Sequence, residues 1–302
     1  MDYILLHKSF GAVSMSMVQD RMTEEIILVA KTNTGYWQIK EKDGEWMALT
    51  SVMKILENKF SNVINWGNHV FSQNNYFKVN KPAGISLASD KAQSRMFLQE
   101  SGIKVPKTYM ETNLNFYEKL KYPLIVRPSH HHGGKDFNVF QNYKELEPFL
   151  WGKVFPHWYV SEVFEKTTEY RVHCGHGRVL IVQEKPLVPG ELRANQAVNH
   201  ESWKVLKWGE INQKIALESL KAVKVLGLDY GAVDIMYNST DGSFAICEVN
   251  TSPSINTDYS SGKYAKYFSW IIRNNFPKHF SLIEGFGKNG YIFDNDMLEE
   301  TF

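Results

Sequence analysis

The sequence has little cysteine, no long apolar run and no excess of charge of either sign. Its two cysteines, Cys174 and Cys247, lie far apart and outside any CxxC pattern, which argues against a zinc knuckle and against a disulfide framework. No stretch approaches the roughly 18 apolar residues of a membrane-spanning helix, and Ile4–Leu6 is too short for the core of a signal peptide. We therefore expect a soluble, cytoplasmic protein with no membrane partner.

Charge is balanced, with 34 Lys and Arg residues against 33 Asp and Glu residues. A formal net charge of +1 gives no electrostatic reason to expect a nucleic acid as partner, although a local basic cleft is compatible with it. The hydrophobic fraction of 43% suffices for a real core, and 302 residues correspond to about two domains or one large multi-lobed domain.

Strand and helix patterns alternate along the chain. Short apolar or alternating stretches predict strands at 26–30, 35–40, 63–66, 76–79, 124–127, 137–140, 159–164, 170–173 and 179–183. Ser89-Asp90 can cap a helix that Gly102 closes. Asn212 can cap a second helix, which ends at Gly227. The interleaving predicts an α/β (α+β) fold rather than a helical bundle or a β-sandwich.

The most informative segment, residues 231–250, has two strand-like runs around Thr240-Asp241-Gly242. A three-residue hairpin loop with glycine in the left-handed position sets a register in which Asp234 faces Glu248. Asn250 shares a face with Glu248, because residues two apart point to the same side of a strand. Three oxygen-bearing side chains therefore converge among apolar neighbours.

Two carboxylates on this otherwise apolar hairpin repel each other and cost desolvation unless a cation lies between them. Oxygen ligands alone favour a hard ion such as Mg²⁺ that also carries phosphate oxygens. A surface hairpin with its acidic face in water accounts for the same spacing, so both interpretations stay open. Cys247 follows the alternation to the face opposite Glu248 and is expected in the core.

A second stretch, residues 123–137, combines an apolar strand, a basic residue and a loop with two glycines. Arg127 ends the strand, and the glycine loop (Gly133-Gly134) lets backbone N–H groups approach an anion such as a nucleotide phosphate. A Gly-Gly pair also occurs in ordinary hairpins. Consecutive histidines seldom converge on one ion, so His130–His132 are expected to contact phosphate or solvent rather than a metal.

In this order, the segments from about Val79 to Ile255 resemble the ATP-grasp superfamily, which includes D-alanine–D-alanine ligase, glutathione synthetase and the enzymes that add glutamate to a ribosomal protein. The resemblance is carried by Asn80-Lys-Pro through Lys91, Gly102 through Thr108, Ile125-Val-Arg127-Pro, Ser161 through Glu165, Glu169-Tyr-Arg171-Val, and Glu248-Val-Asn250-Thr-Ser-Pro253. It implies an ATP-grasp fold with an N-terminal α/β domain over 1–88, a central lobe over 89–165 and a C-terminal lobe over 166–302, the two lobes clasping the nucleotide.

The resemblance also implies which residues bind ATP. Lys91, Arg127 and the glycine loop would contact phosphates, with an arginine where the family usually has a lysine, so that the charge is kept in a planar fork. Val163, in the hinge strand, would meet the adenine edge beside Glu162. Glu169, seven residues after Glu162, would hold the ribose hydroxyls. Without the resemblance, both glutamates would be interpreted as solvated strand charges.

At the reaction centre, Lys185 and Arg193 resemble the basic pair that meets the transferred phosphate, and Asp234, Glu248 and Asn250 occupy the family's positions for Mg²⁺ (or Mn²⁺). ATP would phosphorylate a carboxylate to an acyl phosphate, an amine would attack it, and ADP and phosphate would leave. The substrates would be an acid plus an amine, either small molecules or peptides. A homodimer stays open, since dimers are common among relatives.

Two other classes of function stay open beside the ligase. One is an ATP-dependent kinase or phosphotransferase that stops at a phosphorylated product, and the other is a nucleotide-binding scaffold that has lost turnover. The complete set of metal ligands argues against the scaffold. For the ligase we expect Glu248→Gln to abolish activity and to leave the melting temperature equal or higher, because carboxylate repulsion is relieved.

Overall fold

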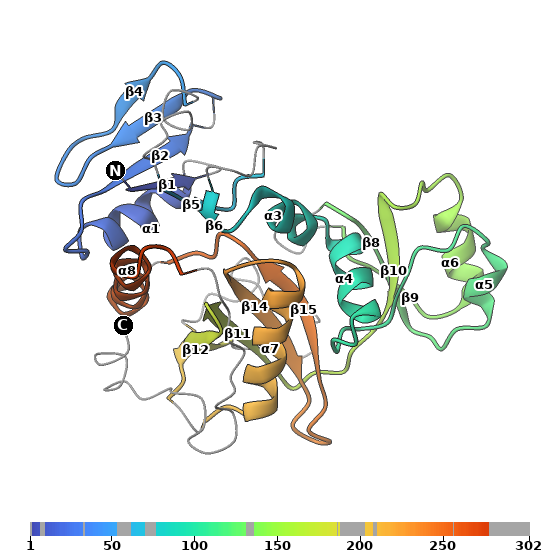
Figure 1. Cartoon of the computed structure of the whole chain (residues 1–302). Helices are drawn as coiled ribbons and strands as arrows, with labels where there is room; N and C mark the ends of the chain where they lie inside the picture. The colour runs from blue at the N-terminus through green and yellow to red at the C-terminus, as the bar shows by residue number, and fades with distance from the viewer. Residues whose placement is uncertain are drawn as a thin grey trace.

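The structure is a computed structural model that describes residues 2–6, 10–32, 34–52, 62–69, 77–130, 136–185, 187, 203–207, 210–255 and 257–277. Strands and helices interleave along these residues, and the strands form three sheets (Figure 1). The predicted α/β (α+β) class is therefore confirmed. Within the described ranges, every helix is too short or too polar to span a lipid bilayer.

The N-terminal sheet has the strand order β4-β3-β2-β1-β5-β6. Its strands are β1 (Asp2–Leu6), β2 (Ile26–Lys31), β3 (Trp37–Lys40), β4 (Met47–Leu49), β5 (Asn62–Trp66) and β6 (Phe77–Val79). Strand β1 pairs in parallel with β2 and β5, and α1 (Phe10–Gln19) connects β1 to β2. Helix α8 (Asp258–Arg273) packs beside α1 (Figure 1), so segments from opposite ends of the described chain share one core.

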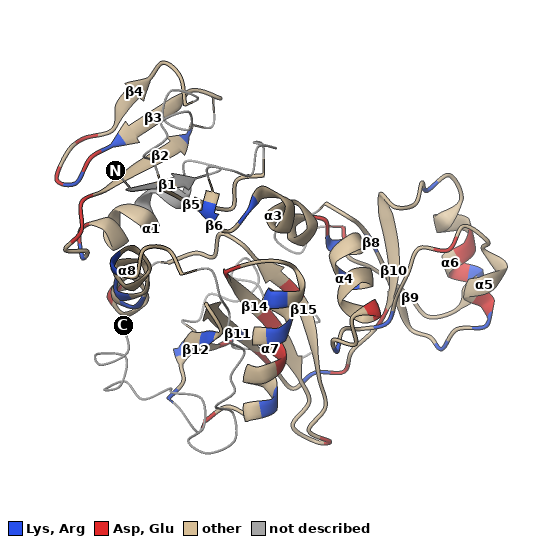
Figure 2. Ribbon diagram, in the orientation of Figure 1, with Lys and Arg blue, Asp and Glu red and all other residues tan. Residues whose placement is uncertain are grey.

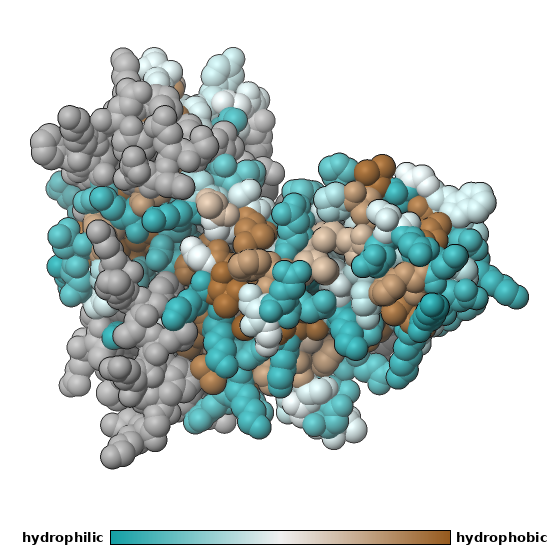
Figure 3. All heavy atoms as spheres, turned by 45° about the vertical axis from the view of Figure 1, so that its right-hand side comes forward, coloured by the Kyte–Doolittle hydropathy of each residue, from teal (hydrophilic) through white to brown (hydrophobic). Residues whose placement is uncertain are grey.

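The second sheet, β7-β10-β8-β9, belongs to a lobe that projects from the rest of the molecule (Figures 1 and 3). Its elements are β7 (Thr108–Tyr109), α5 (Asn115–Glu118), β8 (Leu124–Pro128), β9 (Asn138–Phe140), α6 (Tyr143–Leu150) and β10 (Trp158–Glu162). The lobe has its own core around the buried side chains of Tyr117, Leu146 and Val160. The glycine loop falls between β8 and β9 and lies outside the described residues.

The third sheet, β13-β12-β11-β14-β15, is antiparallel throughout. Its strands are β11 (Thr168–Gly175), β12 (Arg178–Lys185), β13 (Lys204–Val205), β14 (Tyr230–Tyr237) and β15 (Phe244–Asn250). Helix α7 (Gln213–Val225) covers one face, while α3 (Pro82–Ser89) and α4 (Lys91–Glu100) lie along the β15 edge (Figure 1). Helices α4, α6 and α7 each carry both acidic and basic residues (Figure 2), in keeping with the balanced charge.

The predicted helix ends are confirmed at α4 and α7. Asp90 caps α4 by accepting a hydrogen bond from the backbone N–H of Gln93 at 3.0 Å, and Gly102, at φ +76°, follows the helix in the left-handed conformation. Asn212 caps α7 in the same way, accepting from the N–H of Lys214 at 2.9 Å. The cap at Asp90 fixes where α4 begins, so Lys91 is the first residue of this helix.

Two helical glycines provide a matched test of packing. A Cβ on Gly84 in α3 would lie 2.8 Å from the carbonyl oxygen of Leu226 and 2.9 Å from that of Gly227, so Gly84→Ala should destabilise the protein by about 1–3 kcal/mol. Gly262 in α8 has no atom within 4 Å of such a Cβ, and Gly262→Ala should stabilise by up to about 1 kcal/mol. Urea unfolding of both variants measures the difference, and equal effects would contradict the packing of α3 against the end of α7.

Candidate active site

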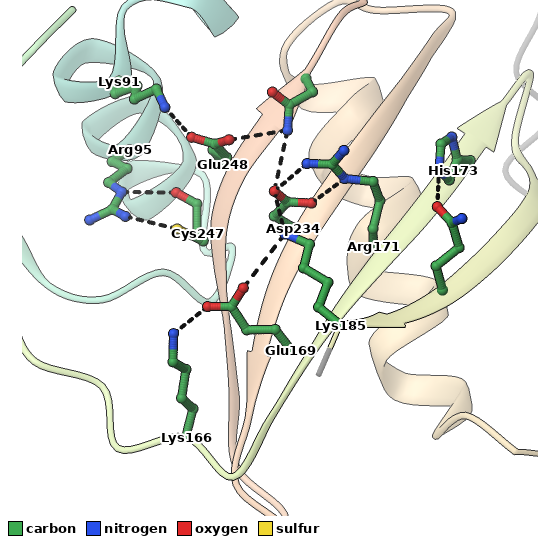
Figure 4. Close-up of polar contacts among 12 residues, drawn as sticks. Lys91, Arg95, Lys166, Glu169, Arg171, His173, Lys185, Asp234, Cys247 and Glu248 are labelled. Atoms are coloured by element: carbon green, nitrogen blue, oxygen red, sulfur yellow. Dashed lines mark hydrogen bonds and ion pairs between the residues drawn. The ribbon is translucent and has the colours of Figure 1, made fainter. Parts of the chain in front are cut away.

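One row of paired residues crosses four strands of the third sheet. The strand registers place Gln183 of β12 opposite Arg171 of β11, Arg171 opposite Asp234 of β14, and Asp234 opposite Glu248 of β15. Two residues further along the same pair of strands, Glu169 lies opposite Lys185. Because alternate residues of a strand share a face, these charged groups gather on one side of the sheet (Figure 4).

Asp234 pairs with Glu248 as predicted, but the loop length and the strand pairing that lead to this register differ from the prediction. The N–H of Asn238 donates to the carbonyl oxygen of Ser243 at 2.9 Å, so the loop between these two has four residues rather than three. The pairing then shifts by one residue next to Asp234, where Cys247 forms a β-bulge in β15. The longer loop and the bulge compensate each other, which is why the predicted pair is right although the predicted loop is wrong.

The same bulge corrects the predicted position of Cys247. Cys247 and Glu248 are consecutive and half-buried, and both point toward α4 (Figure 4). Arg95 of α4 donates from Nε to the carbonyl oxygen of Cys247 at 3.0 Å, and its Nη2 lies 3.4 Å from Sγ. The expected core position is wrong because strict alternation of faces does not hold across a bulge.

Asp234 is buried and bonded to two cations. Arg171 donates from Nε to Oδ1 at 2.6 Å and from Nη2 to Oδ2 at 2.7 Å, and Nζ of Lys185 lies 2.7 Å from Oδ2. Burial alone would raise the pKa of Asp234, but the charges of Arg171 and Lys185 outweigh it and hold that pKa well below its usual range. Asp234 is therefore an ionised carboxylate at neutral pH.

Glu248 forms an ion pair with Lys91 of α4. Burial raises and the charge of Lys91 lowers the pKa of Glu248, which moves from 4.5 to about 2. Nδ2 of Asn250 donates to Glu248 Oε1 at 3.2 Å and to Asp234 Oδ2 at 3.4 Å, so it bridges the two carboxylates. The sequence indicated that these carboxylates repel each other unless a cation lies between them, and in the structure Lys91, Arg171 and Lys185 supply positive charge to the two groups.

Glu162 and Glu169, which the resemblance assigns to adenine and ribose, both contact other side chains of this chain. Glu169 is buried between Lys166 and Lys185, with 3.5 Å from its Oε2 to Nζ of Lys185, and it is not a solvated strand charge. Glu162, which ends β10, accepts a hydrogen bond from the Tyr109 hydroxyl at 3.0 Å. Burial and this bond raise the pKa of Tyr109 to about 12. Val163 follows Glu162 and is half-buried.

The end of β8 adjoins the start of α4, because the backbone N–H of Lys91 donates to the carbonyl oxygen of Ser129 at 3.1 Å. Arg127, also at the end of β8, is 9% exposed and lies with its guanidinium carbon 5.2 Å from the ring centre of Phe137. Lys91 and Arg127 therefore come from segments that meet. Of the predicted site residues, Gly133, Gly134 and Arg193 lie outside the described residues.

His173 connects the polar face to α8. Its Nε2 lies 3.1 Å from Gln183 Oε1 and its Nδ1 lies 2.9 Å from the Tyr264 hydroxyl. The amide oxygen can only accept, so Nε2 carries the proton and Nδ1 accepts from the hydroxyl. Burial and the charge of Arg171 lower the pKa of His173 to about 3, which keeps the ring neutral.

Sequence reasoning missed Arg171 and Trp203 as site residues. Arg171 is two residues from Glu169 on the same strand face, a signal that was available once Glu169 was singled out. The ring centre of Trp203 lies 4.7 Å from the guanidinium carbon of Arg171 and 5.2 Å from Nζ of Lys185. No local pattern around Trp203 indicates these contacts.

The donor set at the hairpin suits a hard divalent ion. Asp234, Glu248 and Asn250 offer carboxylate and amide oxygens, the ligands that Mg²⁺ takes in proteins. Within the ranges that the structure describes, no three His, Cys, Asp or Glu side chains form a cluster able to hold a metal. A metal at this hairpin would therefore depend on the amide of Asn250 and on oxygens from another molecule.

The low pKa of Glu248 predicts a loss of stability in acid. Because the folded pKa of about 2 lies below the unfolded value of 4.5, the ionised group contributes stability above about pH 4.5 that is lost as the pH falls toward 2. The pKa of Asp234 is also lowered, so its ionised form likewise contributes stability that is lost in acid. Melting temperatures measured across this range should fall less steeply in Glu248→Gln than in the unmodified protein, and parallel curves would contradict the ion pair with Lys91.

Known proteins match this chain over most of its length. A family profile described as a RimK-like ATP-grasp domain matches residues 88–265. The tetrahydromethanopterin:alpha-L-glutamate ligase of Methanocaldococcus jannaschii is 28% identical over 201 residues, which are 60% of this chain and 64% of that protein. The carbamoyl-phosphate synthase of Methanobrevibacter smithii is 25% identical over 176 residues, 56% of this chain and 47% of that one. This chain thus spans less than two thirds of either relative.

Solved structures share the fold. The VanG D-Ala:D-Ser ligase from Enterococcus faecalis has a TM-score of 0.62 at 17% identity, covering 87% of this chain and 97% of that one. The D-alanine–D-alanine ligase from Bacillus anthracis complexed with ATP has a TM-score of 0.60 at 18% identity, covering 92% of this chain and 100% of that one. At these identities the similarity establishes the fold.

Proposed function

The chain belongs to the RimK-like ATP-grasp family, and we propose that it is an ATP-dependent ligase that joins a carboxylate to an amine through an acyl phosphate. ADP and phosphate would be released. The observation that carries this proposal is the meeting of three oxygen donors and three cations on one face of the third sheet, namely Asp234, Glu248, Asn250, Lys91, Arg171 and Lys185.

An amino acid or a peptide is the substrate class that we propose. One relative is named as a glutamate ligase, and the proteins of similar fold are named as D-alanine ligases. Both names describe reactions that join an amino acid through a carboxylate–amine bond. We therefore expect both the acid and the amine to be amino acids or peptides.

Asp234, Glu248 and Asn250 would hold Mg²⁺ or Mn²⁺. A divalent ion there would offset the negative charge that builds up on the phosphates during transfer. The three side chains would contribute fixed oxygens from two paired strands, so the ion's place would be set by the β14–β15 register. The bridging amide of Asn250 would turn its oxygen toward the ion, since an Asn side chain offers both a donor and an acceptor end.

The cations would bind the phosphates. Lys91 has three N–H donors and could bond Glu248 and a phosphate oxygen together. Arg127 and the glycine loop would hold the same phosphates, and Lys185 and Arg193 would orient the group that is transferred. A closed site protects the acyl phosphate from water, which would otherwise hydrolyse it.

The nucleoside would lie between the second and third sheets. Glu162 and the backbone of Val163, where β10 ends, would meet the adenine, and Glu169 at the start of β11 would hold the ribose hydroxyls. The limits of the three domains (1–88, 89–165 and 166–302), the homodimer and the cytoplasmic location stay predictions from the sequence.

A product assay separates the three classes of function. The protein would be incubated with ATP, Mg²⁺ and pooled amino acids and short peptides, with product masses measured by mass spectrometry. ADP and inorganic phosphate formed only when both an acid and an amine are supplied would support the ligase. A stable phosphorylated product would identify a kinase instead. Nucleotide binding without ADP formation would identify a scaffold.

A further inference from the structure

Trp203 lies beside the charged row without being part of it. It directly precedes β13, whose Lys204 and Val205 pair with Glu184 and Gln183 of β12. This pairing fixes the backbone next to Trp203 to the strand that carries Lys185. The side chain is half-buried, so one part of the indole contacts protein and another part faces solvent.

One indole contacts both cations that bind the same carboxylate. The guanidinium carbon of Arg171 lies 4.7 Å from the Trp203 ring centre, and Nζ of Lys185 lies 5.2 Å from it. Both distances are within the range of a cation–π interaction. Arg171 and Lys185 also bond Asp234, so each of the two cations contacts both the ring and the carboxylate.

An aromatic face attracts a cation without accepting its conventional hydrogen bonds, so the N–H donors remain available to anions. Arg171 uses Nε and Nη2 for Asp234, and among the described residues no acceptor bonds its Nη1. Lys185 is directed to Asp234 and Glu169. Trp203 therefore limits where these two side chains can move and leaves part of their donor capacity for a phosphate.

We propose that Trp203 is a positioning residue for phosphoryl transfer, which holds Arg171 and Lys185 against Asp234 and closes this side of the charged row to water. The inference rests on the proposed ligase function. Without the ring, water reaching the acyl phosphate would break its bond between phosphorus and the acyl oxygen, returning the free carboxylate and inorganic phosphate. ADP would then form without the ligated product.

Two substitutions test the ring itself. Trp203→Leu should lower kcat about tenfold, equivalent to about 1.4 kcal/mol, with the KM for ATP within about twofold of the unmodified value. It should also raise the ratio of ADP formed to ligated product. Trp203→Phe keeps an aromatic face. It should recover most of the lost kcat and most of the coupling, meaning the amount of ligated product formed per ADP. A merely structural role would not produce this split between kcat and KM or the recovery by phenylalanine.

Trp151→Leu is the matched control, because Trp151 is 71% exposed and lies in the projecting lobe, directly after α6. Its rate and coupling should equal those of the unmodified protein. If Trp203→Leu behaves like this control while the unmodified protein ligates an acid to an amine, the role of Trp203 is refuted and the ligase stands. Failure of the unmodified protein to ligate would refute the proposed function before any variant is compared.

A spectroscopic readout is independent of turnover. In protein labelled with 5-fluorotryptophan, the ¹⁹F resonance absent from Trp203→Phe belongs to Trp203. Addition of Mg²⁺ with a non-hydrolysable ATP analogue should shift this resonance, because the cations against the ring would gain a phosphate partner. The Trp151 resonance, assigned in the same way, should stay in place. A Trp203 resonance that does not move on saturation would overturn the inference.

Discussion

Asp234→Asn should destabilise the folded protein by about 3–5 kcal/mol, in addition to abolishing ATP turnover. The carboxylate is 7% exposed and bonds Arg171 through both oxygens and Lys185 through one. A neutral amide would leave Lys185 with Glu169 at 3.5 Å as its remaining carboxylate, and Arg171 with only the longer-range charge of Glu248. Breaking a buried ion pair by removing one partner is costly because the other charge stays buried and uncompensated.

Urea unfolding of Asp234→Asn measures this effect, with Asp241→Asn as its control. Asp241 lies at the tip of the same hairpin and is exposed, so the control makes the same chemical change outside the charged row. We expect a change within about 0.5 kcal/mol for the control. Equal unfolding free energies for the two variants would show that Asp234 is not held by Arg171 and Lys185 as the structure has it.

Glu248→Gln should lower ATP turnover at least about a hundredfold while costing much less stability than Asp234→Asn. A metal ion supplies several kcal/mol to phosphoryl transfer, and each 1.4 kcal/mol is about tenfold in rate. The side chains of Glu248 and Lys91 are 21% and 18% exposed, so Lys91 can turn toward solvent when its partner is lost. Relief of repulsion from Asp234 offsets part of the loss.

This expectation revises the one from the sequence, which was an equal or higher melting temperature. Because Lys91 holds the pKa of Glu248 below its usual value, the ionised carboxylate stabilises the fold, and the melting temperature should fall slightly. Turnover at increasing Mg²⁺ concentration and thermal unfolding would be measured on the same samples. Glu100→Gln, at the exposed last residue of α4, is the control and should change neither the turnover nor the melting temperature. Full turnover in Glu248→Gln would remove Glu248 from the reaction centre.

Local patterns predicted the elements that carry the site. Alternation located β11 and β12, the strand-like runs around the Thr240-Asp241-Gly242 turn located β14 and β15, and the capping residues Asp90 and Asn212 located the starts of α4 and α7. The pairing of Asp234 with Glu248 was also predicted, although a longer loop and a bulge at Cys247 both departed from the assumed hairpin. Bulges are not visible in an apolar run, since the extra residue has the same chemistry as its neighbours.

The cations that bind Asp234 and Glu248 could not be predicted from local sequence patterns. Arg171 and Asp234 are 63 residues apart, and Lys91 and Glu248 are 157 apart, so their contacts follow from sheet order and from the docking of α4. Helix α1 was missed because it is apolar, with no acidic residue in its first turn and no basic residue in its last. Helix α6 was missed because it contains Pro148, a residue that normally argues against a helix interior.

Diffraction from crystals grown with Mn²⁺ and a non-hydrolysable ATP analogue tests most directly whether the β14–β15 hairpin binds a divalent ion against the nucleotide. We expect an anomalous manganese peak coordinated by oxygens of Asp234, Glu248 and Asn250 and by phosphate oxygens. Bound nucleotide with no manganese at the hairpin, and with Asp234 and Glu248 bonded only to Arg171, Lys185 and Lys91, would contradict it.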